Sequence, residues 1–213
     1  FYCYNGATPL SSAMFSVRYM LSDNPMEADM FKTFVGSENG NYLYRNNYCL
    51  PLGFMMDEDA IQAWTDSSAG RTGSLNALAT ALGCEENMLS TVDCTMEATE
   101  GDTSIDIPED GYYYADYTTC NSDSLNVNRN DGWNMNYSKT THRYLLGLGK
   151  CKAGDRIHIS NTNMETIYFS VYKLNTDVVE QCYHTLNRQT MKLTSMTDRS
   201  VEGNVNVKEE GRL

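Results

Sequence analysis

Three consecutive acidic residues, Asp57, Glu58 and Asp59, form the first group in the chain whose chemistry suggests catalysis. Hydrolysis of a glycosidic bond needs two carboxyl groups that face each other across a cleft, one of them with a raised pKa. These three residues are adjacent, at the boundary between a strand-like run and a helix-like run, and nothing in the sequence supplies the second wall of a site. We therefore interpret them as favourable negative charge at a helix N-terminus and predict no catalytic residue.

The three histidines, His142, His158 and His184, are the next candidates for catalysis. A nucleophilic site needs a serine or cysteine close to a histidine and an acid, and the sequence has no GxSxG motif. His142 and His158 lie in strand-like runs, where we expect partly buried side chains, and His184 lies on a predicted helix. These patterns do not favour a catalytic triad.

Residues 126–132 (NVNRNDG) place polar side chains at alternate positions, as a calcium-binding loop does. However, Gly132 falls one place late, the first position holds neutral Asn126, and no glutamate closes the loop as a bidentate ligand. We interpret the segment as a turn. We predict no metal and no cofactor.

The chain has seven cysteines, an odd number and a high one for its length. None forms a CxxC pair, and the histidines do not fall at zinc-finger distances from them, which argues against a structural zinc site. In an extracytoplasmic protein the cysteines could form up to three disulfides and leave one thiol. Alternatively, most are small buried residues with free thiols. The sequence leaves both interpretations open.

Tyrosine and tryptophan residues are concentrated between positions 112 and 144. Aromatic rings can stack on the apolar faces of sugar rings, although in alternating strands at least half of these side chains should point into the core. Trp133 follows a polar loop and Gly132, which makes it the best candidate for an exposed platform. The residues predicted to bind carbohydrate are Trp133, Tyr113, Tyr117 and Tyr137.

The chain is acidic, with 28 acidic and 16 basic residues and a net charge of −12. The charges are dispersed and no stripe of lysine or arginine occurs, which argues against nucleic acid and anionic lipid surfaces as partners. The longest nearly apolar run, residues 50–56, is far shorter than the roughly 20 residues that cross a bilayer as a helix. The abrupt start at Phe1 and end at Leu213 lead us to expect a piece of a longer protein.

The elements that would position these side chains are mainly strands, most clearly between Thr103 and Lys173. Apolar residues alternate in residues 104–107 and 156–159, and they are almost continuous in residues 166–173, as in a strand covered on both faces. In the turns that precede Tyr112 and Arg156, Gly111 and Gly154 could take positive φ, and Asp110 and Asp155 could cap the backbone. Strands separated by turns without helices predict an antiparallel β-sandwich or jelly roll.

The remaining segments predict a small α/β unit and several helices, so the fold class is α+β and mainly β. We expect a hairpin through Asn39 and Gly40, and a helix that begins near Ser11 or Ser12. Other expected elements are strands at 17–22 and 49–56, a helical turn at 27–29, helices at 59–65, 74–82 (ended by Gly83) and 176–189, and strands in 190–213. The predicted segments are 1–56 (α/β unit), 57–92 (helical connector), 93–174 (β-sandwich) and 175–213 (helix and strands returning to the first unit).

The order of these segments resembles the YfhO family of bacterial membrane proteins. FSVRYMLS (residues 15–22) resembles the family's LLGVKYVIS segment, and residues 42–46 and 50–54 (LPLGF) resemble the hairpin and the LPLGF strand that follow it. Residues 76–83 (NALATALG) resemble a family helix, and residues 201–207 (VEGNVNV) resemble a late strand. The resemblance covers most of the chain, and it rests on the order and spacing of short apolar motifs.

The resemblance implies a large multi-pass membrane protein similar to GT-C-type glycosyltransferases, which use lipid-phosphate-linked sugars. Members are implicated in decorating cell-surface polymers such as lipoteichoic acid in Gram-positive bacteria. The chain matches the extracytoplasmic region near the C-terminus, and the family's catalytic motif lies outside it, so no catalytic residue is carried over.

We therefore expect a non-catalytic extracytoplasmic domain that positions an acceptor polymer or a partner protein at the membrane. An alternative is a carbohydrate-binding or adhesion module of a secreted or surface protein. A third hypothesis, a hydrolase, would require activity that is lost in Asp57→Asn or Asp59→Asn.

Overall fold

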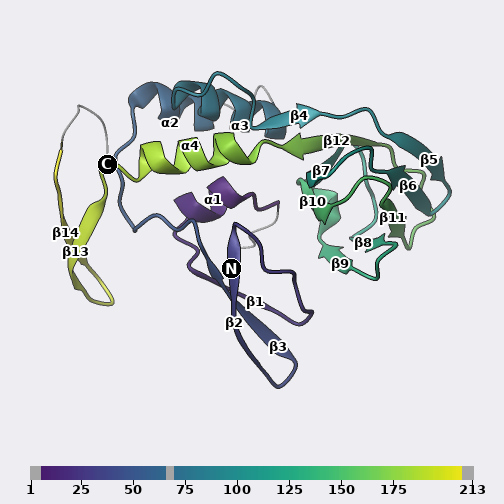
Figure 1. Cartoon of the computed structure of the whole chain (residues 1–213), viewed down its shortest axis with the longest axis horizontal. Coiled ribbons are helices and arrows are strands. Elements are labelled where there is room, and N and C mark those ends of the chain that lie inside the picture. Colours follow the sequence, from purple (N-terminus) through teal and green to yellow (C-terminus); the bar gives the residue numbers. More distant parts are fainter. Residues whose placement is uncertain (1–5, 66–69, 208–213) are drawn as a thin grey trace. The chain divides into compact units, whose positions relative to one another are not determined.

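A computed structural model describes residues 6–65 and 70–207. The chain divides into two compact units, which we describe separately (Figure 1). The sandwich unit contains Asn87–Asn175 and the short stretch that ends at Ala7. The helical unit contains Thr8–Glu86 and the chain from Thr176 onward. The sandwich unit is therefore inserted between two parts of the helical unit.

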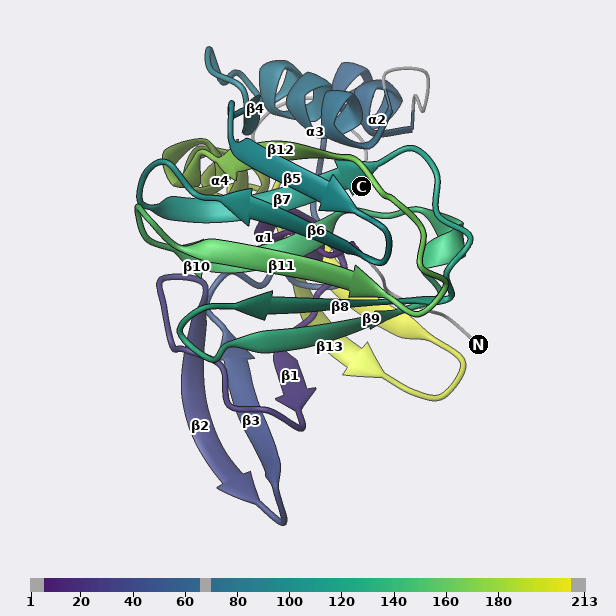
Figure 2. The same cartoon turned by 90° about the vertical axis from the view of Figure 1, so that its right-hand side faces the viewer.

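The sandwich unit consists of two antiparallel sheets. One has the strand order β10-β7-β12-β4, and the other has the order β5-β6-β11-β8-β9 (Figure 2). The strands are β4 (Leu89–Thr91), β5 (Thr95–Thr99), β6 (Asp102–Asp106), β7 (Gly111–Tyr117), β8 (Ser124–Arg129), β9 (Asn134–Ser138), β10 (Leu146–Cys151), β11 (Arg156–Asn161) and β12 (Phe169–Leu174). The chain passes from one sheet to the other repeatedly, which is the connectivity of a jelly roll. The predicted fold class is confirmed.

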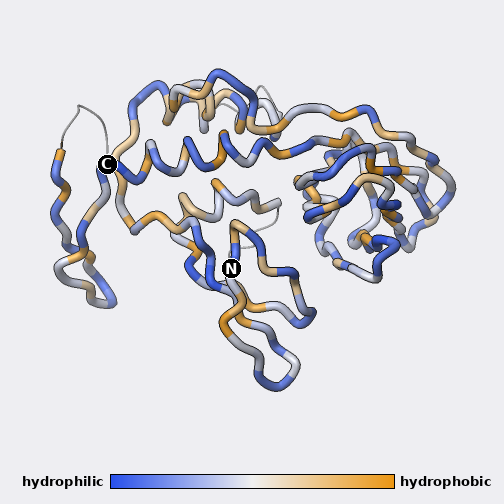
Figure 3. The backbone as a smooth tube through the Cα atoms, in the orientation of Figure 1, coloured by the Kyte–Doolittle hydropathy of each residue, from blue (hydrophilic) through white to orange (hydrophobic). Residues whose placement is uncertain are grey.

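The core of this unit lies between the two sheets and is built by residues that alternate along the strands. Ile157 and Ile159 on β11 are 0% and 2% exposed, and they pair with Ile105 and Thr103 of β6 in the register. In the sandwich unit, hydrophobic and hydrophilic residues are interspersed along the chain (Figure 3). The same core cluster receives apolar side chains from both sheets, so the sheets are packed face to face.

The last strand differs in part from its prediction, because one face is covered along the strand and the other is covered only toward its end. In β12, Phe169 and Val171 are buried in the core between the sheets, and Leu174 is buried on the opposite face, whereas Ser170 on that opposite face is exposed. Tyr168, just before the strand, is 72% exposed. The sheet packs on its partner with one side only, so the aromatic residues of this run do not all enter the core.

The two turns that flank β7 and β11 close by hydrogen bonds from aspartates. Asp155 accepts a 2.8 Å hydrogen bond from the Lys152 amide within its own turn. Asp110 instead accepts from the amide of Ala153, in the other turn, at 2.9 Å. Gly154 has the predicted positive φ, +86°, but Gly111 has no positive φ, because β7 begins at that residue.

In its described residues, the helical unit combines four helices with a three-stranded sheet, in the order β1-β3-β2, and a late hairpin. Its elements are α1 (Pro9–Met14), β1 (Tyr19–Ser22), β2 (Lys32–Glu38), β3 (Asn41–Asn46), α2 (Glu58–Thr65), α3 (Gly70–Ala81), α4 (Thr176–Leu186), β13 (Met191–Met196) and β14 (Val201–Val205). Helix α4 packs against both α1 and α3. Its buried residues Val178, Val179, Cys182 and Leu186 form the apolar side that these contacts need.

Helix α1 begins one turn earlier than predicted. Its N-cap is Thr8, whose Oγ1 accepts a hydrogen bond from the Ser11 amide, while the Ser11 hydroxyl accepts from the Thr8 amide. This capping box gives hydrogen-bond partners to the amides of Thr8 and Ser11 at the start of the helix. Pro9, at the first helical position, has no amide hydrogen and therefore needs no partner. Ser11 therefore contributes to the cap from inside the helix.

The hairpin of β2 and β3 confirms its prediction, with φ of +50° at Asn39 and +78° at Gly40. On β3, the Tyr44 hydroxyl accepts a 2.7 Å hydrogen bond from the Met26 amide and donates one of 2.8 Å to the Met26 carbonyl. Residues 25–29 are irregular rather than helical, so the predicted turn at 27–29 is wrong. The Tyr44 hydroxyl bonds both backbone groups of Met26, and the Met26 carbonyl is the acceptor that a helical turn over the following residues would have needed.

Residues 49–56 do not form the predicted strand. The segment makes isolated bridges instead, among them one between Phe54 and Thr190, and the Met55 amide donates to the Gln189 carbonyl at 2.8 Å. Gly53 favours this approach, since a Cβ atom built on it would lie 3.1 Å from the Cβ of Met191 and would require a small shift of that residue. Pro51 has no amide hydrogen, which limits a regular ladder here.

The helices α2 and α3 are confirmed, although α3 begins at Gly70 rather than at Ser74. Residues 70–73, predicted as a link, are its first turn. Gly83 ends the helix with φ of +88°, as predicted for a C-terminal cap.

We expect Thr103→Val to lower the free energy of unfolding of the sandwich unit by about 1–3 kcal/mol. Thr103 is 1% exposed, and its hydroxyl donates a 2.7 Å hydrogen bond to the buried Ile167 carbonyl, which valine cannot replace. The measurement is urea denaturation followed by Trp133 fluorescence in a Trp64→Phe background. The same substitution at the exposed Thr95 of β5 should change stability by less than about 0.5 kcal/mol. Equal losses at both positions would contradict this role of the hydroxyl.

Candidate functional site

Two of the four residues predicted to bind carbohydrate lie inside the core of the sandwich unit. Tyr113 and Tyr117 are 0% and 2% exposed. The Tyr113 hydroxyl donates to the Glu109 carbonyl at 2.9 Å, and the Tyr117 hydroxyl donates to the Thr140 carbonyl at 2.8 Å. Burial raises the pKa of Tyr113 to about 12. Because the rings are covered by core side chains, they offer no face to a sugar, and the candidate site is reduced to the other two residues.

Trp133 and Tyr137 lie where the two sheets meet at an edge, which we call the β9–β10 edge. Tyr137 is on β9, the last strand of one sheet, and its hydroxyl donates a 2.6 Å hydrogen bond to the Gly147 carbonyl on β10, the last strand of the other. A Cβ atom built on Gly149 would lie 3.6 Å from Cζ2 of Trp133. Gly147 and Gly149 of β10 thus lie directly beside the two large rings. Both rings are partly buried and pack against the core cluster.

Arg129, at the end of β8, is the charged group at this edge. Its guanidinium carbon lies 5.3 Å from the centre of the Trp133 ring, which is within the range of a cation–π contact. Its Nη2 atom lies 2.7 Å from Oδ2 of Asp131, and the other oxygen of Asp131 accepts from the Trp133 amide at 3.0 Å. The Arg129 side chain is only 8% exposed, so these contacts compensate the cost of removing its charge from water.

The ion pair changes the acidity of its carboxylate. The hydrogen bond from Arg129 holds the pKa of Asp131 below its ordinary value of 3.8. Beside the pair, burial raises the pKa of the Cys151 thiol to about 11, and the residue is 1% exposed. The thiol therefore stays protonated at neutral pH and is a poor nucleophile.

The arrangement favours binding rather than catalysis. Arg129 already stacks on the Trp133 ring, so a sugar would either use the remaining exposed part of the indole or displace the guanidinium. Sequence reasoning missed Arg129 because it did not consider a cation two residues before Asp131 at the turn. It also missed Tyr168, the most exposed large aromatic ring of this unit among the described residues.

The other candidates of the sequence lie on other elements of the chain. Asp57, Glu58 and Asp59 are exposed, and the last two lie in the first turn of α2, as expected for helix-terminal charge. His184 on α4 is exposed and lies 3.6 Å from Glu180. The burial predicted for two histidines is wrong. His142 is exposed in the 3-10 helix Thr140–His142, and His158 points outward between Ile157 and Ile159, with Nδ1 3.1 Å from Asp102.

The segment tested as a calcium loop is the end of β8 followed by a turn. Within residues 6–65 and 70–207, no group of three or more His, Cys, Asp or Glu side chains could hold a metal ion. Across the same ranges, every helix is too short or too polar to cross a bilayer.

We expect Arg129→Met to raise the pKa of Asp131 toward 3.8, because the hydrogen bond that stabilises its carboxylate is removed. In the parent chain this carboxylate stabilises the fold above its unfolded-state pKa, and that contribution is lost as the pH falls through the lower folded-state pKa. Arg129→Met should therefore lose less stability on acidification. The measurement is a carboxyl ¹³C NMR titration.

Lys173→Met is the control, since Lys173 pairs with Glu109 at 2.9 Å in the same unit and does not contact Asp131. It should leave the Asp131 titration unchanged. An identical Asp131 pKa in the parent chain and in Arg129→Met would contradict the assigned cause.

Comparison with known proteins identifies one family. Residues 1–213 match the family described as "Bacterial membrane protein YfhO". Searches of curated proteins and of solved structures found no match. Because the match covers the whole chain, this protein belongs to the YfhO family of bacterial membrane proteins.

Proposed function

We propose that this chain is a non-catalytic extramembrane domain of a YfhO membrane protein, on the extracytoplasmic side, and that it positions an acceptor polymer for a glycosyl transfer in the membrane part. The observation that supports the proposal is the family match over the whole chain, combined with described helices that are all too short or too polar to span a bilayer. A partner protein at the same surface is the other ligand consistent with this role.

The charge of the chain restricts how a lipoteichoic-acid-like acceptor would be bound. Such polymers carry phosphates, and the chain has a net charge of −12. Electrostatic repulsion disfavours recognition through phosphate, which needs concentrated positive charge. Recognition is therefore directed at the neutral parts of the acceptor, its sugars or polyols.

The β9–β10 edge supplies a surface of the required kind. Trp133 is partly exposed and held by Arg129, and Tyr137 is fixed by its hydrogen bond to Gly147. Aromatic rings fixed in this way lose little freedom when a ligand stacks on them. Lectin domains are among the proteins with jelly-roll architecture. Because one fold supports many functions, this analogy alone does not indicate sugar binding, and the proposal depends on the Trp133 and Tyr137 side chains.

The test is calorimetric titration of the chain with a glycosylated glycerol-phosphate polymer and with the unglycosylated polymer. We expect binding of the first, and a loss of affinity of about 3- to 10-fold in Trp133→Leu, because the stacking ring is removed. Trp64→Leu is the matched control, since Trp64 lies on α2 of the other unit, and its affinity should equal that of the parent chain.

Salt separates the two modes of recognition. Contacts to sugars predict an affinity that stays constant or rises between about 50 and 200 mM salt, whereas phosphate contacts predict a steep fall. Equal binding of both polymers, a steep fall with salt, or no binding of either polymer would each contradict the proposal. Far-UV circular dichroism of both leucine variants checks that the fold is retained.

A further inference from the structure

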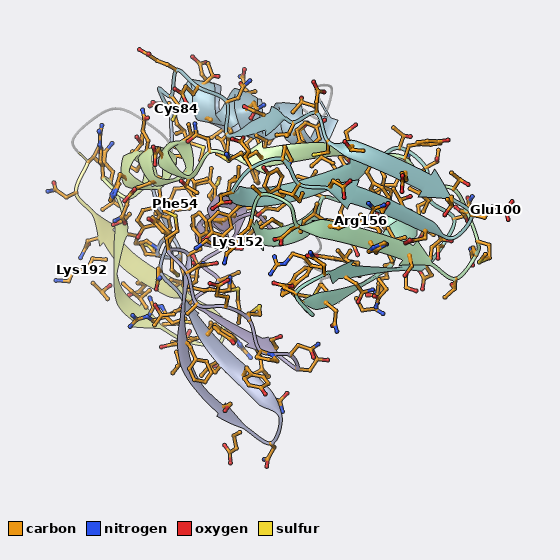
Figure 4. The ribbon with its side chains drawn as sticks, turned by 45° about the vertical axis from the view of Figure 1, so that its right-hand side comes forward. Phe54, Cys84, Glu100, Lys152, Arg156 and Lys192 are labelled. Carbon is orange, nitrogen blue, oxygen red and sulfur yellow. The ribbon has the colours of Figure 1, made fainter. Side chains whose placement is uncertain are left out.

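Two cysteines of the helical unit place their thiols in contact. The Sγ atoms of Cys84 and Cys182 lie 3.5 Å apart. Cys84 follows the end of α3 (Figure 4), and Cys182 lies in the middle of α4; their exposed fractions are 4% and 0%. A disulfide has an S–S bond of about 2 Å, so closing the gap needs a shift of about 1.5 Å.

The segments that carry Cys84 and Cys182 are also in contact through neighbouring residues. Helix α3 packs against α4, and Nε2 of Gln181, the residue before Cys182, donates a 3.1 Å hydrogen bond to the carbonyl of Gly83, the residue before Cys84. The sulfur atoms therefore meet as part of a defined helix–helix contact. Other described cysteines contact oxygen instead: Cys49, Cys120 and Cys151 each lie within hydrogen-bond distance of backbone carbonyls.

The pair also has a special place along the chain. The chain leaves the helical unit after Glu86 and returns to it at Thr176, with the sandwich unit between. Cys84 comes just before the exit and Cys182 just after the return, 98 residues apart in sequence. A bond between them would close a loop that contains the inserted segment Asn87–Asn175.

We propose that Cys84 and Cys182 are a redox-active pair: a small-molecule disulfide oxidises them, and they form a disulfide bond with each other. This bond links the two parts of the helical unit on either side of the inserted segment. The proposal goes beyond the acceptor-positioning function and does not depend on the side of the membrane. It can be tested with the purified chain and oxidised glutathione.

The reaction is a thiol–disulfide exchange in two steps. One cysteine thiolate attacks a sulfur of oxidised glutathione, forms a mixed disulfide and releases one glutathione thiolate. The second cysteine thiolate attacks the protein sulfur of the mixed disulfide and releases the other. The two cysteines lose two electrons and two protons, and the oxidant is reduced to two molecules of glutathione.

Burial determines when this reaction occurs. Burial and the contact with Cys84 raise the pKa of the Cys182 thiol, so little thiolate is present in the folded, reduced chain. The buried pair is also closed to glutathione. Oxidation should therefore take place during folding or in a locally opened state, and be faster at low urea concentrations than in buffer alone.

The experiment incubates the full chain of 213 residues in glutathione buffers of rising oxidised fraction, alkylates the remaining thiols under denaturing conditions, and maps the peptides by mass spectrometry. We expect a linked peptide that contains Cys84 and Cys182, with a mass about 2 Da below the sum of its two reduced parts. Alkylation of both cysteines at every glutathione ratio, or a link from either to another cysteine, would overturn the proposal.

A second measurement compares the thermal unfolding midpoints of the oxidised and the reduced chain, both with all cysteines present. In a Trp133→Phe background, Trp64 reports the unfolding of the helical unit, and the oxidised chain should unfold about 5–10 °C above the reduced chain. Cys84→Ala should abolish both the linked peptide and this difference, whereas Cys49→Ala, a partly exposed thiol of the same unit, should retain both. Equal midpoints for oxidised and reduced chains would contradict the stabilising role of the bond.

Discussion

The pairing of β4 with β12 is the constraint on which the arrangement of the chain depends. These strands join the first and last parts of the sandwich unit, with Leu89 opposite Leu174, and the Asn175 amide donates a 2.8 Å hydrogen bond to the Met88 carbonyl. The inserted unit thus begins and ends at neighbouring backbone positions. Because its ends meet, the helical unit can be built from two distant stretches of chain without distortion of either.

Packing between the sheets explains why the jelly roll closes where it does. Six strands, β6, β7, β8, β10, β11 and β12, contribute buried residues to one core, and at the β9–β10 edge Gly147 and Gly149 of β10 lie beside Tyr137 and Trp133. Trp133 and Tyr137 pack on the core at this edge, and Arg129 covers the indole in turn. The residues best placed to meet a ligand therefore also complete the core, so binding and folding use the same side chains.

Local patterns predicted the fold well where one residue type determines the geometry. Asn39 and Gly40 indicated the hairpin because both tolerate positive φ, and the alternation of Ile157 and Ile159 indicated an inward face. The failures have a common physical cause, since burial and pairing depend on distant parts of the chain. Residues 49–56 are apolar like a strand, yet they form isolated bridges, such as that of Phe54 with Thr190, instead of a ladder.

The candidate site was only partly predictable for the same reason. A run of tyrosines predicts a strand, but only its register against the other sheet decides which rings are exposed. Tyr113 and Tyr117 share one face of β7 because they are an even number of residues apart, and that face is the inner one. The contact of Arg129 with Trp133 required a turn whose conformation the sequence left open.

The insertion of one unit within the other has a consequence for synthesis on the ribosome. Helices α1 and α3 emerge early, but α4, which covers them, is made only after the whole jelly roll. At about 5–20 residues per second, the roughly 100 residues involved take about 5–20 s. During that time the apolar side of α3, with Leu75 and Leu78, has no α4 to cover it. The nascent chain therefore exposes α1 and α3 until α4 has been synthesised. Chaperones and the rate of translation can then influence the yield of folded protein.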